Sequence, residues 1–460
     1  MLCADEKMST VNSVDLHYDA IVVGLGKTGL SCFRYLSNQG LSVAITDSRE
    51  TPPELSKLQE EFESAPTYLG QINEKALLAS DQIILSPGIS LDHKSIKLSI
   101  ENNIPVFGDI ELFCQEAKAP IIAISGSNGK STVTTMVAEM TRSAGLKTYV
   151  GGNIGTPALD LLDDTIPDLY VLELSSFQLE TTFSLNAHAS VVLNISPDHM
   201  DRYSSFHEYA DAKKRIYLGQ GFMVVNKDEE YFHSVIDDNR EIIYFTLTTP
   251  EEGNYGLIIN DKEVWLSHGS NKIINKNQLK IRGEHNVSNA LAAMALAETV
   301  DVPKDVMTGV LKEFVGLAHR CQLIKVINDV TWYNDSKATN VESCIASIKG
   351  LSELGDIILI AGGDSKEADL SCLRAIIEKY VKKVFLLGID ASKLASFIGP
   401  DIEKKFVKNM NEAVAEAGKI ASSGDIVLLS PACSSLDMYT NYQQRGDAFI
   451  SAVNALSNNV

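Results

Sequence analysis

Residues 121–132 read IIAISGSNGKST. An apolar run ends at a serine, a glycine-rich loop follows, and Lys130 precedes two hydroxyl side chains. This order predicts a buried strand, a phosphate-binding loop and a helix start, because backbone N–H groups and a helix N-terminus favour anions. Ile124 replaces the first glycine of the standard phosphate loop, so this loop is a short variant. The residues expected at the phosphates are Gly126, Ser127, Asn128, Gly129, Lys130, Ser131 and Thr132.

A second glycine turn, GLGKTG, lies at 24–29. It follows an apolar run and precedes a helical stretch, and Asp47 stands about twenty residues further on. In this context glycines let the backbone approach a diphosphate at a helix N-terminus. NAD binding is one interpretation, and a tight turn without a ligand is another. No hydride-transfer site is recognisable downstream, which speaks against NAD.

Composition limits the class of protein. The 460 residues carry a net charge of −20, with 45% hydrophobic and 22% charged residues. The length suggests roughly three domains, and the acidic balance argues against nucleic-acid binding, which requires basic surfaces. The seven cysteines form no CxxC pair, the first residues contain no apolar signal segment, and no apolar run is long enough to span a membrane. A cytoplasmic protein is expected.

Strand-like runs alternate with helical stretches along nearly the whole chain. This pattern predicts an α/β fold with mainly parallel sheets. Domain boundaries are expected near residues 109 and 317, which gives the segments 1–108, 109–316 and 317–460. The section 220–280 is the least clear and is interpreted as short strands and turns.

Several polar residues follow apolar runs and are expected at strand ends, where open α/β sheets bind ligands. Glu173 is a candidate metal ligand, a helix cap or a paired core carboxylate. His199 is a candidate ligand or a loop histidine, and Lys213 on a helical stretch is by itself a solvated charge. Asn286 and Asn289 lie three apart at a helix start and share one face.

Further polar clusters lie in the last segment. The loops GGDSK at 362–366 and SPACSSLD at 430–437 follow apolar runs and have the composition of substrate loops. Cys433 is interpreted as a small buried thiol and not a nucleophile, because no histidine lies nearby in the sequence.

Together these motifs make the chain resemble the Mur ligase family over nearly its whole length. The resemblance is carried by GLGKTGLS, SPGI, GDIELF, GSNGKSTVTT, GGNIGTPAL, LELSSFQLE, NISPDHMDRY, GEHNVSNALAA, NDSKATN, GGDSK and LSPACSSLDMYTNYQQRG. It implies a Rossmann-like N-terminal domain, a central P-loop ATP-binding domain and a Rossmann-like C-terminal domain. It further implies a monomeric ATP-dependent ligase that adds D-glutamate to UDP-N-acetylmuramoyl-L-alanine, through an acyl phosphate and a tetrahedral intermediate, in peptidoglycan precursor synthesis.

The resemblance also implies roles for individual residues. Contacts to the UDP-sugar are implied for Gly26, Lys27, Thr28, Asp47, Arg49, Gly88, Asn153 and His199. Beyond the phosphate loop, contacts to ATP are implied for Asn286, Asn289, Arg320 and Asp335. Contacts to D-glutamate are implied for Thr339, Lys366, Ser435, Leu436 and Tyr442. The implied ligands of two Mg²⁺ ions are Ser131, Glu173, His199 and Lys213 as a carbamate, and the implied catalytic residues are Lys130, Glu173, His199 and Lys213.

The chain departs from the family pattern at three positions. Lys27 stands where an apolar residue is expected, Ala318 where a proline is expected, and Tyr442 where a phenylalanine is usual. Lys214 is the alternative to Lys213 if the register differs by one residue. The remaining alternatives are a sister ligase for another amino acid, folylpolyglutamate synthase, whose first- and third-domain motifs match poorly, and a catalytically silent binding protein.

Overall fold

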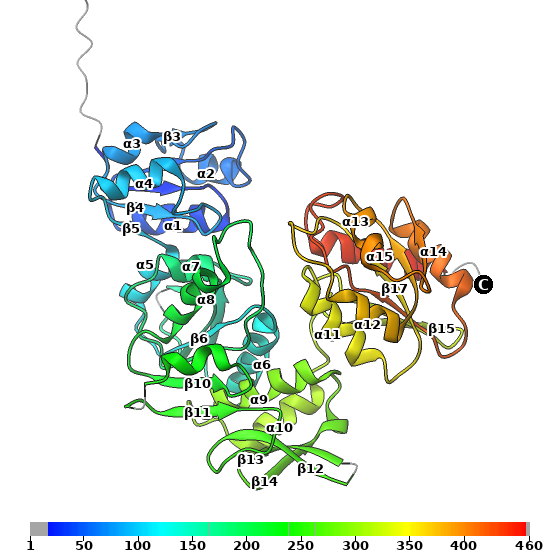
Figure 1. The fold of residues 1–460 in the computed structure, drawn as a ribbon. Helices are drawn as coiled ribbons and strands as arrows, with labels where there is room; N and C mark the ends of the chain where they lie inside the picture. Colours follow the sequence, from blue (N-terminus) through cyan, green and yellow to red (C-terminus); the bar gives the residue numbers. More distant parts are fainter. Residues whose placement is uncertain (1–16, 164, 238, 262, 457–460) are drawn as a thin grey trace, which may run out of the picture. The chain divides into compact units, whose positions relative to one another are not determined.

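The computed structural model describes residues 17–163, 165–237, 239–261 and 263–456. The N-terminal stretch in which no secretory signal was recognised falls at 1–16 and is outside the described residues. The described strands form three sheets, and Figure 1 labels many of the helices and strands. Most neighbouring strands with a recorded pairing are parallel, which confirms the predicted α/β class. None of the described helices is long and apolar enough to cross a membrane.

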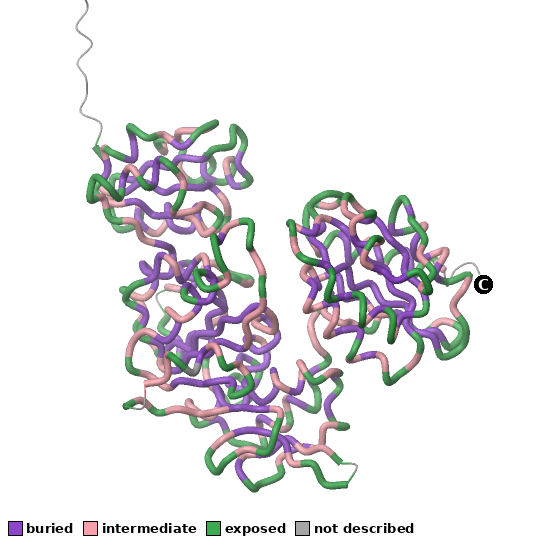
Figure 2. Tube along the Cα trace, in the orientation of Figure 1, coloured by how far each residue is buried: buried purple, intermediate pink, exposed green. Residues whose placement is uncertain are grey.

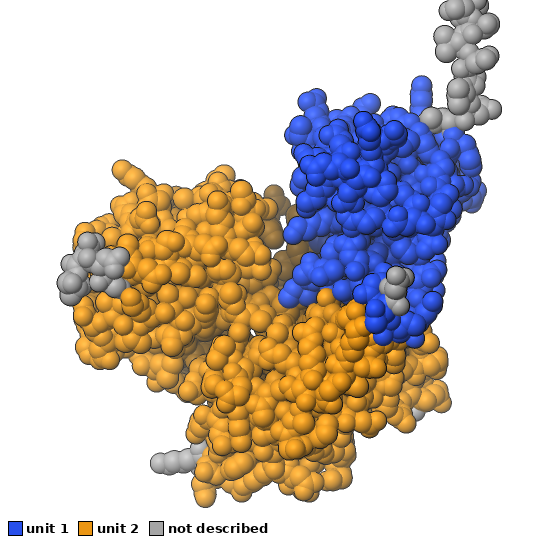
Figure 3. Space-filling view, turned by 180° about the vertical axis from the view of Figure 1, so that it is seen from behind, with its two compact units in different colours: residues 1–118, 151–166, 177–185 blue, residues 119–150, 167–176, 186–460 orange. Residues whose placement is uncertain are grey.

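By its internal contacts the chain divides into two compact units, coloured separately in Figure 3. The first unit comprises Met1–Lys118, Gly151–Ile166 and Phe177–Leu185, and the second comprises Ala119–Val150, Pro167–Ser176 and Asn186–Val460. The first unit is therefore assembled from separate stretches of sequence. Its edge at Lys118 does not coincide with the expected boundary after residue 108, and the boundaries at 108 and 316 stay predictions.

The first unit contains a five-stranded parallel sheet in the order β3-β2-β1-β4-β5. Its elements are β1 (Ala20–Val23), α1 (Lys27–Asn38), β2 (Val43–Thr46), α2 (Leu55–Glu61), β3 (Thr67–Tyr68), α3 (Glu74–Leu78), β4 (Ile83–Leu85), α4 (Lys94–Glu101), β5 (Val106–Phe107), α5 (Asp109–Glu116) and the 3₁₀ helix η1 (Ala158–Leu161). Strand β1 is apolar throughout and buried between β2 and β4, as a parallel strand covered on both faces requires.

The glycine turn joins β1 to α1 as the sequence predicts. Gly24 has a φ of +97°, and a Cβ added at Gly29 would lie 1.8 Å from the carbonyl oxygen of Gly24. Asp47 follows β2 directly, and its carboxylate accepts a hydrogen bond of 2.7 Å from the N–H of Leu25. The turn is thus too tight for a side chain at Gly29 and is held in place by a buried carboxylate.

The second unit begins with a nine-stranded sheet in the order β14-β13-β12-β11-β10-β9-β6-β8-β7. Its strands are β6 (Ile121–Ser125), β7 (Thr148–Gly152, whose last two residues fall in the first unit), β8 (Leu169–Glu173), β9 (Ala189–Val192), β10 (Phe222–Asn226), β11 (Ile242–Phe245), β12 (Tyr255–Asn260), β13 (Glu263–His268) and β14 (Asn271–Asn275). The unclear section 220–280 is therefore the run of strands β10 to β14, which ends in antiparallel pairs.

Helices and short 3₁₀ turns accompany this sheet. They are α6 (Lys130–Ser143), α7 (Ser176–Glu180, shared between the units), α8 (Phe206–Lys214), η2 (Arg215–Tyr217), η3 (Glu230–Val235), η4 (Lys276–Gln278), α9 (Glu284–Glu298) and α10 (Lys304–Glu313). Helix α9 is the helix predicted from the motif GEHNVSNALAA. Nearly all of its residues from Asn289 to Ala297 are alanine, leucine or methionine and are buried in the core of this sheet.

The second unit also contains a six-stranded sheet in the order β15-β16-β20-β17-β18-β19. Its elements are β15 (Gln322–Ile327), β16 (Val330–Asn334), α11 (Val341–Leu351), β17 (Ile357–Ala361), α12 (Leu373–Tyr380), β18 (Val381–Leu386), α13 (Ala391–Phe397), β19 (Glu403–Phe406), α14 (Met410–Ile420), β20 (Ile426–Leu429) and α15 (Tyr442–Leu456). Strands β17 and β20 are buried along their whole length, and Figure 2 shows the buried residues concentrated in the strands.

Replacing Gly29 by alanine tests the glycine turn. The added methyl group would collide with the Gly24 carbonyl oxygen, so we expect the free energy of unfolding in urea to fall by about 1–3 kcal/mol, as in other overpacked sites. Gly26→Ala is the matched control, because a Cβ there meets no atom within 4 Å and the φ of Gly26 is −96°. Equal losses in the two variants would contradict the steric explanation.

Candidate functional site

The carboxyl ends of three neighbouring strands form the centre of the candidate site in the second unit. Strand β6 lies between β8 and β9, and all three are parallel. Ile124 pairs with Glu173, the last residue of β8, while Ser125 pairs with Val192, the last residue of β9. The phosphate loop therefore starts beside Glu173, at the sheet edge where α/β proteins bind ligands.

The phosphate loop turns at two glycines, and the side chain of Lys130 lies against the backbone of the loop. Gly126 and Gly129 have φ values of +147° and +83°, a region that favours glycine. The Nζ of Lys130 donates to the carbonyl oxygens of Gly126 and Ser127, at 2.7 and 2.9 Å. Burial lowers the pKa of Lys130, and the negative charge of Glu173 opposes that shift.

Two residues that the sequence analysis did not single out brace this loop. The side chain of Asn194 accepts from the N–H of Asn128 at 2.9 Å and donates to its carbonyl oxygen at 3.1 Å. The hydroxyl groups of Ser127 and Tyr209 lie 3.0 Å apart in the interior. Asn194 is the first residue of the motif NISPDHMDRY and closely follows β9. This position could have indicated that it lies near the phosphate loop.

Lys213 is buried against the phosphate loop. Its Nζ donates to the carbonyl oxygen of Gly126 at 3.0 Å, the same oxygen that accepts from Lys130. Burial, followed by the charge of Lys130, lowers the pKa of Lys213 well below its ordinary value. Lys214 turns away and pairs with Asp211 at 2.9 Å. Of the two adjacent lysines, Lys213 is the one at the loop.

His199 follows β9 with a left-handed backbone, at a φ of 58°. Its Nε2 lies 3.6 Å from an oxygen of Asp198. Burial lowers the pKa of the imidazole, and Asp198 opposes the shift. The residue is partly accessible, which is compatible with either a ligand or a loop histidine.

The implied magnesium ligands have suitable chemistry. Mg²⁺ prefers oxygen ligands, and Ser131 and Glu173 supply a hydroxyl and a carboxylate. Carbamylation of Lys213 would replace its amine nitrogen with a carboxylate-like group, whose oxygens could bind the ion. Only the imidazole of His199 is an unusual ligand for this ion.

A cavity of about 670 Å³ in the second unit collects most of the predicted ATP contacts. Its lining includes Asn128, Gly129, Thr132, Asn286, Asn289, Arg320 and Asp335. The Nδ2 of Asn289 donates to Asn286 at 3.3 Å, which confirms that the two face one side of the helix. Arg320 donates to the hydroxyl of Ser131 at 2.7 Å, so it reaches the end of the phosphate loop.

Asp335 is tied into the protein by three donors. Its carboxylate accepts from the hydroxyls of Ser347 and Ser430, at 2.6 and 2.8 Å, and from the N–H of Cys321 at 3.0 Å. Burial raises its pKa to about 6. Because Cys321 directly follows Arg320, Asp335 also fixes the backbone that carries this arginine.

A second cavity, of about 520 Å³, lies in the first unit. Its lining includes seven of the eight residues predicted to contact the UDP-sugar: Gly26, Lys27, Thr28, Asp47, Arg49, Gly88 and Asn153. The eighth, His199, belongs to the second unit. Gln178 also lines the cavity and was missed, although it lies within the quoted motif LELSSFQLE.

The second cavity has a net positive lining. Its charged lining residues are Lys27, Asp47 and Arg49. Arg49 pairs with Asp47 at 2.6 Å, and although burial acts to raise the pKa of Asp47, this arginine and two backbone N–H groups lower it. Lys27, exposed at the start of α1, therefore supplies the net charge.

The five residues predicted to hold D-glutamate line neither of these two cavities. Thr339, Lys366 and Tyr442 are partly buried, Ser435 is buried and Leu436 is exposed. Arg445, which the sequence analysis missed, connects the loops that carry several of them. Its guanidinium donates to the carbonyl oxygens of Ser336, Cys433 and Ser434, at 2.8, 3.1 and 3.1 Å. Burial lowers its pKa to about 10.

Cys433 has the environment predicted for it. The thiol is fully buried, and burial raises its pKa to about 12. Since the thiolate is the nucleophile, such a group is unreactive. The interpretation as a small buried thiol is confirmed.

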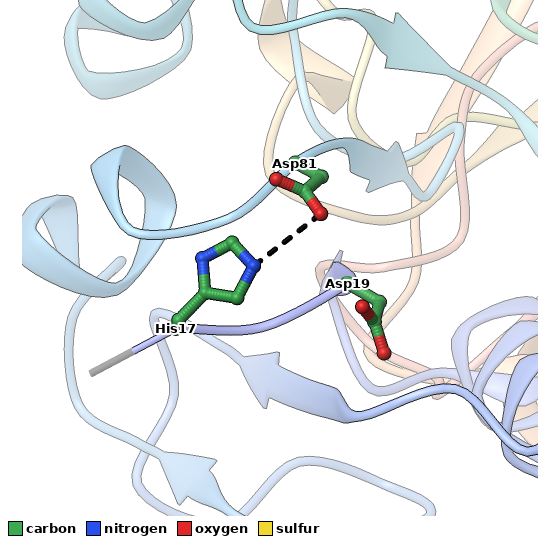
Figure 4. A group of neighbouring side chains, drawn as sticks. All are labelled: His17, Asp19 and Asp81. Atoms are coloured by element: carbon green, nitrogen blue, oxygen red, sulfur yellow. Dashed lines mark ion pairs between the residues drawn. The ribbon is translucent and has the colours of Figure 1, made fainter. Parts of the chain in front are cut away.

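Among the described residues, one group of His, Cys, Asp and Glu side chains is close enough to share a metal ion. It consists of His17, Asp19 and Asp81 in the first unit and was not predicted. Figure 4 shows the ion pair of His17 with Asp81, at 3.4 Å, beside Asp19. Asp19 already accepts from the N–H of Ser42 at 2.6 Å. Both members of the pair are exposed, so the group is explained as a surface ion pair.

Three family models match the chain in order. The Mur ligase MurD-like, N-terminal domain matches residues 18–108, the Mur ligase middle domain matches 124–297, and the Mur ligase, glutamate ligase domain matches 319–433. Together the three matches include most of each of the three sheets.

Two curated relatives match over almost their entire length. The UDP-N-acetylmuramoylalanine--D-glutamate ligase of Nitrosococcus oceani is 48% identical, over 94% of this chain and 96% of the relative. The ligase of the same name from Pseudomonas aeruginosa is 47% identical, over 95% of this chain and 98% of the relative.

Solved structures share the fold at low sequence identity. The UDP-N-acetylmuramate-alanine ligase of Thermotoga maritima has a TM-score of 0.61 at 18% identity and covers 96% of this chain and 100% of that chain. A pseudomurein peptide ligase type C from Methanothermus fervidus has a TM-score of 0.60 at 19% identity, with the same coverage. On the family models and the curated relatives together, the chain belongs to the Mur ligase family.

Proposed function

We propose that this chain is an ATP-dependent ligase that adds D-glutamate to UDP-N-acetylmuramoyl-L-alanine in peptidoglycan precursor synthesis. The observation that carries the proposal is the 48% identity, over 94% of the chain, to a relative named for this reaction. We further propose that the protein acts as a cytoplasmic monomer and serves cell-wall growth and division.

Each segment is assigned the main contacts to one substrate, and neighbouring segments add a few residues. The segment 1–108 binds most of the nucleotide sugar, with its diphosphate at the glycine turn in the cavity of the first unit, and Asn153 and His199 of the next segment are assigned to the same substrate. The segment 109–316 holds ATP at the phosphate loop, and Asn286 and Asn289 face the adenine. The segment 317–460 supplies the D-glutamate contacts. The residues assigned to D-glutamate are Thr339, Lys366, Ser435, Leu436 and Tyr442.

The first chemical step is phosphoryl transfer. The alanyl carboxylate of the nucleotide sugar attacks the γ-phosphoryl group of ATP, which forms an acyl phosphate and releases ADP. A carboxylate and a triphosphate repel each other, so the site must neutralise charge. Lys130 provides a cation at the phosphates once its Nζ leaves the loop carbonyls on which it rests. Arg320, which already contacts the loop, adds a second cation.

Ser131, Glu173, His199 and carbamylated Lys213 are proposed to hold two Mg²⁺ ions, which when bound supply positive charge at the phosphates. Carbamylation is chemically reasonable at Lys213. Burial lowers the pKa of its amine well below the usual value, which favours the neutral form. A neutral amine attacks CO₂ to form an N–C bond with loss of one proton. The product is an anion in place of a cation.

The second step forms the amide. The amine of D-glutamate attacks the acyl carbon, a tetrahedral intermediate forms, and it collapses to the amide and phosphate. Acyl phosphates hydrolyse in water, so the residues of the last segment must exclude water as well as deliver the amine. Arg445 contributes by donating to the carbonyl oxygen of Ser434, next to Ser435, and to the hydroxyl of Ser336, which in turn donates to the carbonyl oxygen of Tyr442.

Phosphate release tests the proposed reaction. With ATP, Mg²⁺, bicarbonate and UDP-N-acetylmuramoyl-L-alanine, we expect release to depend on D-glutamate and not on L-glutamate or other amino acids. Lys130→Ala should lower the rate about 10²–10³-fold, because it removes a charge-stabilising donor. Release with another amino acid would assign a sister ligase, and no release by folded protein would refute the proposal.

Lys213→Ala tests the carbamate. We expect almost complete loss of phosphate release, partial recovery with added short-chain carboxylates, and a wild-type rate that falls when bicarbonate and CO₂ are removed. Lys214→Ala is the matched control, since the neighbouring side chain pairs with Asp211 at the helix surface and should remain active. Full activity of Lys213→Ala would exclude the carbamate.

Lys27→Met tests the charge of the nucleotide-sugar cavity. Loss of its net positive charge should raise KM for UDP-N-acetylmuramoyl-L-alanine about fivefold at low ionic strength and by less than about twofold in ~0.5 M salt, because salt screens an exposed charge. Lys57→Met is the control, because Lys57 pairs with Glu54 and does not line the cavity. If KM for the nucleotide sugar is unchanged in Lys27→Met at low ionic strength, the charge of Lys27 has no role in binding this substrate.

A further inference from the structure

We propose that Asp390 is a positioning residue for D-glutamate, because its carboxylate holds the residue before Lys366 and so fixes the loop that presents this lysine to the substrate. This inference rests on the proposed function, since it takes Lys366 as a contact to D-glutamate. Asp390 was not singled out in the sequence, where it stands two residues after the apolar run VFLLG.

The backbone at Lys366 has to be held by its surroundings. Lys366 and Glu367 have φ values of 49° and 61°, in the left-handed region that residues other than glycine rarely adopt. Such a conformation persists only where neighbouring contacts fix it. The N–H of Lys366 donates to the carboxylate of Asp364 at 2.8 Å, but this bond lies within the loop. The loop must therefore also be fixed from outside.

Asp390 provides contacts of this kind. It lies directly before α13, and one oxygen of its carboxylate accepts from both the N–H and the hydroxyl of Ser365, at 2.8 and 2.6 Å. The N–H of Asp390 also donates to the carbonyl oxygen of Gly363 at 3.0 Å. Because Ser365 is buried, loss of the carboxylate would leave its two donors without this acceptor, which is costly enough to rearrange the loop.

A lysine of α13 adds to the same network. The Nζ of Lys393 donates to the hydroxyl of Ser365 at 3.0 Å and to the carbonyl oxygen of Ala368 at 3.2 Å. The hydroxyl of Ser365 thus accepts from Lys393 and donates to Asp390, which is its full capacity as a donor. Contacts from α13 and the residue before it therefore hold the chain on both sides of Lys366.

The neighbouring substrate loop is held by different bonds, which makes the role of Asp390 separable. The N–H of Asp364 donates to the carbonyl oxygen of Ser434 at 3.1 Å, and the N–H of Ser434 donates to the carbonyl oxygen of Asp364 at 2.7 Å. Both bonds join main chains and do not involve the carboxylate of Asp390. Removing this carboxylate should therefore disturb Lys366 more than Ser435.

The ammonium group of Lys366 lies near the residues that follow β9. Although burial acts to raise the pKa of Asp198, the nearby charges of His199 and Lys366 lower it, and Lys130 of the phosphate loop acts in the same direction. The lysine assigned to D-glutamate and the lysine assigned to the phosphates are thus close to one carboxylate. A displaced Lys366 would hold a carboxylate of D-glutamate in a different place relative to the acyl phosphate.

Steady-state phosphate release by the full-length protein, with each substrate varied in turn, tests the inference. Asp390→Ala should raise KM for D-glutamate about tenfold, as expected when hydrogen bonds to a charged acceptor are lost, and change KM for ATP and for the nucleotide sugar by less than about twofold. Asp390→Asn retains an oxygen for Ser365 and should stay within about twofold of the wild type. An unchanged KM for D-glutamate, or equal rises of all three KM values, would overturn the inference.

A double-mutant cycle separates positioning from stability. Lys366→Met should raise KM for D-glutamate at least as much as Asp390→Ala does, and adding Asp390→Ala to it should cause no further rise. A further rise in the double variant would show that Asp390 acts independently of Lys366 and would overturn the inference. An unchanged KM in Lys366→Met would do the same, because Asp390 would then have no contact to position.

Asp369→Ala is the matched control. Asp369 accepts from the N–H and the hydroxyl of Ser371, both at 2.9 Å, in the way that Asp390 accepts from Ser365, but it is exposed and does not bond the loop before Lys366. Its KM for D-glutamate should stay within about twofold of the wild type, and a tenfold rise here as well would overturn the inference.

A second variant covers the case in which Asp390→Ala does not fold. Ser365→Ala removes the hydroxyl bond to Asp390 but keeps the N–H bond, so it should raise KM for D-glutamate about threefold, and a wild-type KM in it would overturn the inference. A wild type that releases no phosphate with D-glutamate would instead refute the proposed function itself.

Discussion

In the second unit β6 runs between β8 and β9 with all three strands parallel, and the proposed chemistry depends on this arrangement. Parallel neighbours end on one side of a sheet, so a loop after β6 must lie beside whatever ends β8 and β9. The pairing of Ile124 with Glu173 brings a carboxylate to the first residues of the phosphate loop. The turn after β9 brings Asn194 to the same loop, where its amide holds the backbone of Asn128.

The carbonyl oxygen of Gly126 is a hydrogen-bond acceptor that two lysine side chains share. Two lysine side chains, Lys130 and Lys213, donate to it from inside the protein. Two buried ammonium groups that share one acceptor repel each other, and the repulsion is relieved when one becomes neutral. Lys213 is buried, and burial together with the charge of Lys130 lowers the pKa of its amine well below the usual value. A modification that makes Lys213 an anion would turn this repulsion between the two side chains into an attraction.

Much of the fold and of the site could be predicted because the signals are local. The alternation of strands and helices, the position of Glu173 at a strand end and the shared face of Asn286 and Asn289 all follow from short stretches of sequence. Arg445 could not be found this way. It is an ordinary polar residue in a helix, and its importance comes from burial beside segments distant in sequence. The choice between Lys213 and Lys214 likewise needed the structure, because adjacent helical residues point in different directions.

The first unit is made from three separated stretches, the last of which ends at Leu185. During synthesis from the N-terminus, the five strands of the first unit's sheet are made first. Strand β6 and helix α6 of the second unit are made next, before the two stretches that complete the first unit. Its cavity needs Asn153 and Gln178, and α5 needs the segment after Phe177. No cut in the chain before Leu185 therefore releases a fragment that contains the whole first unit.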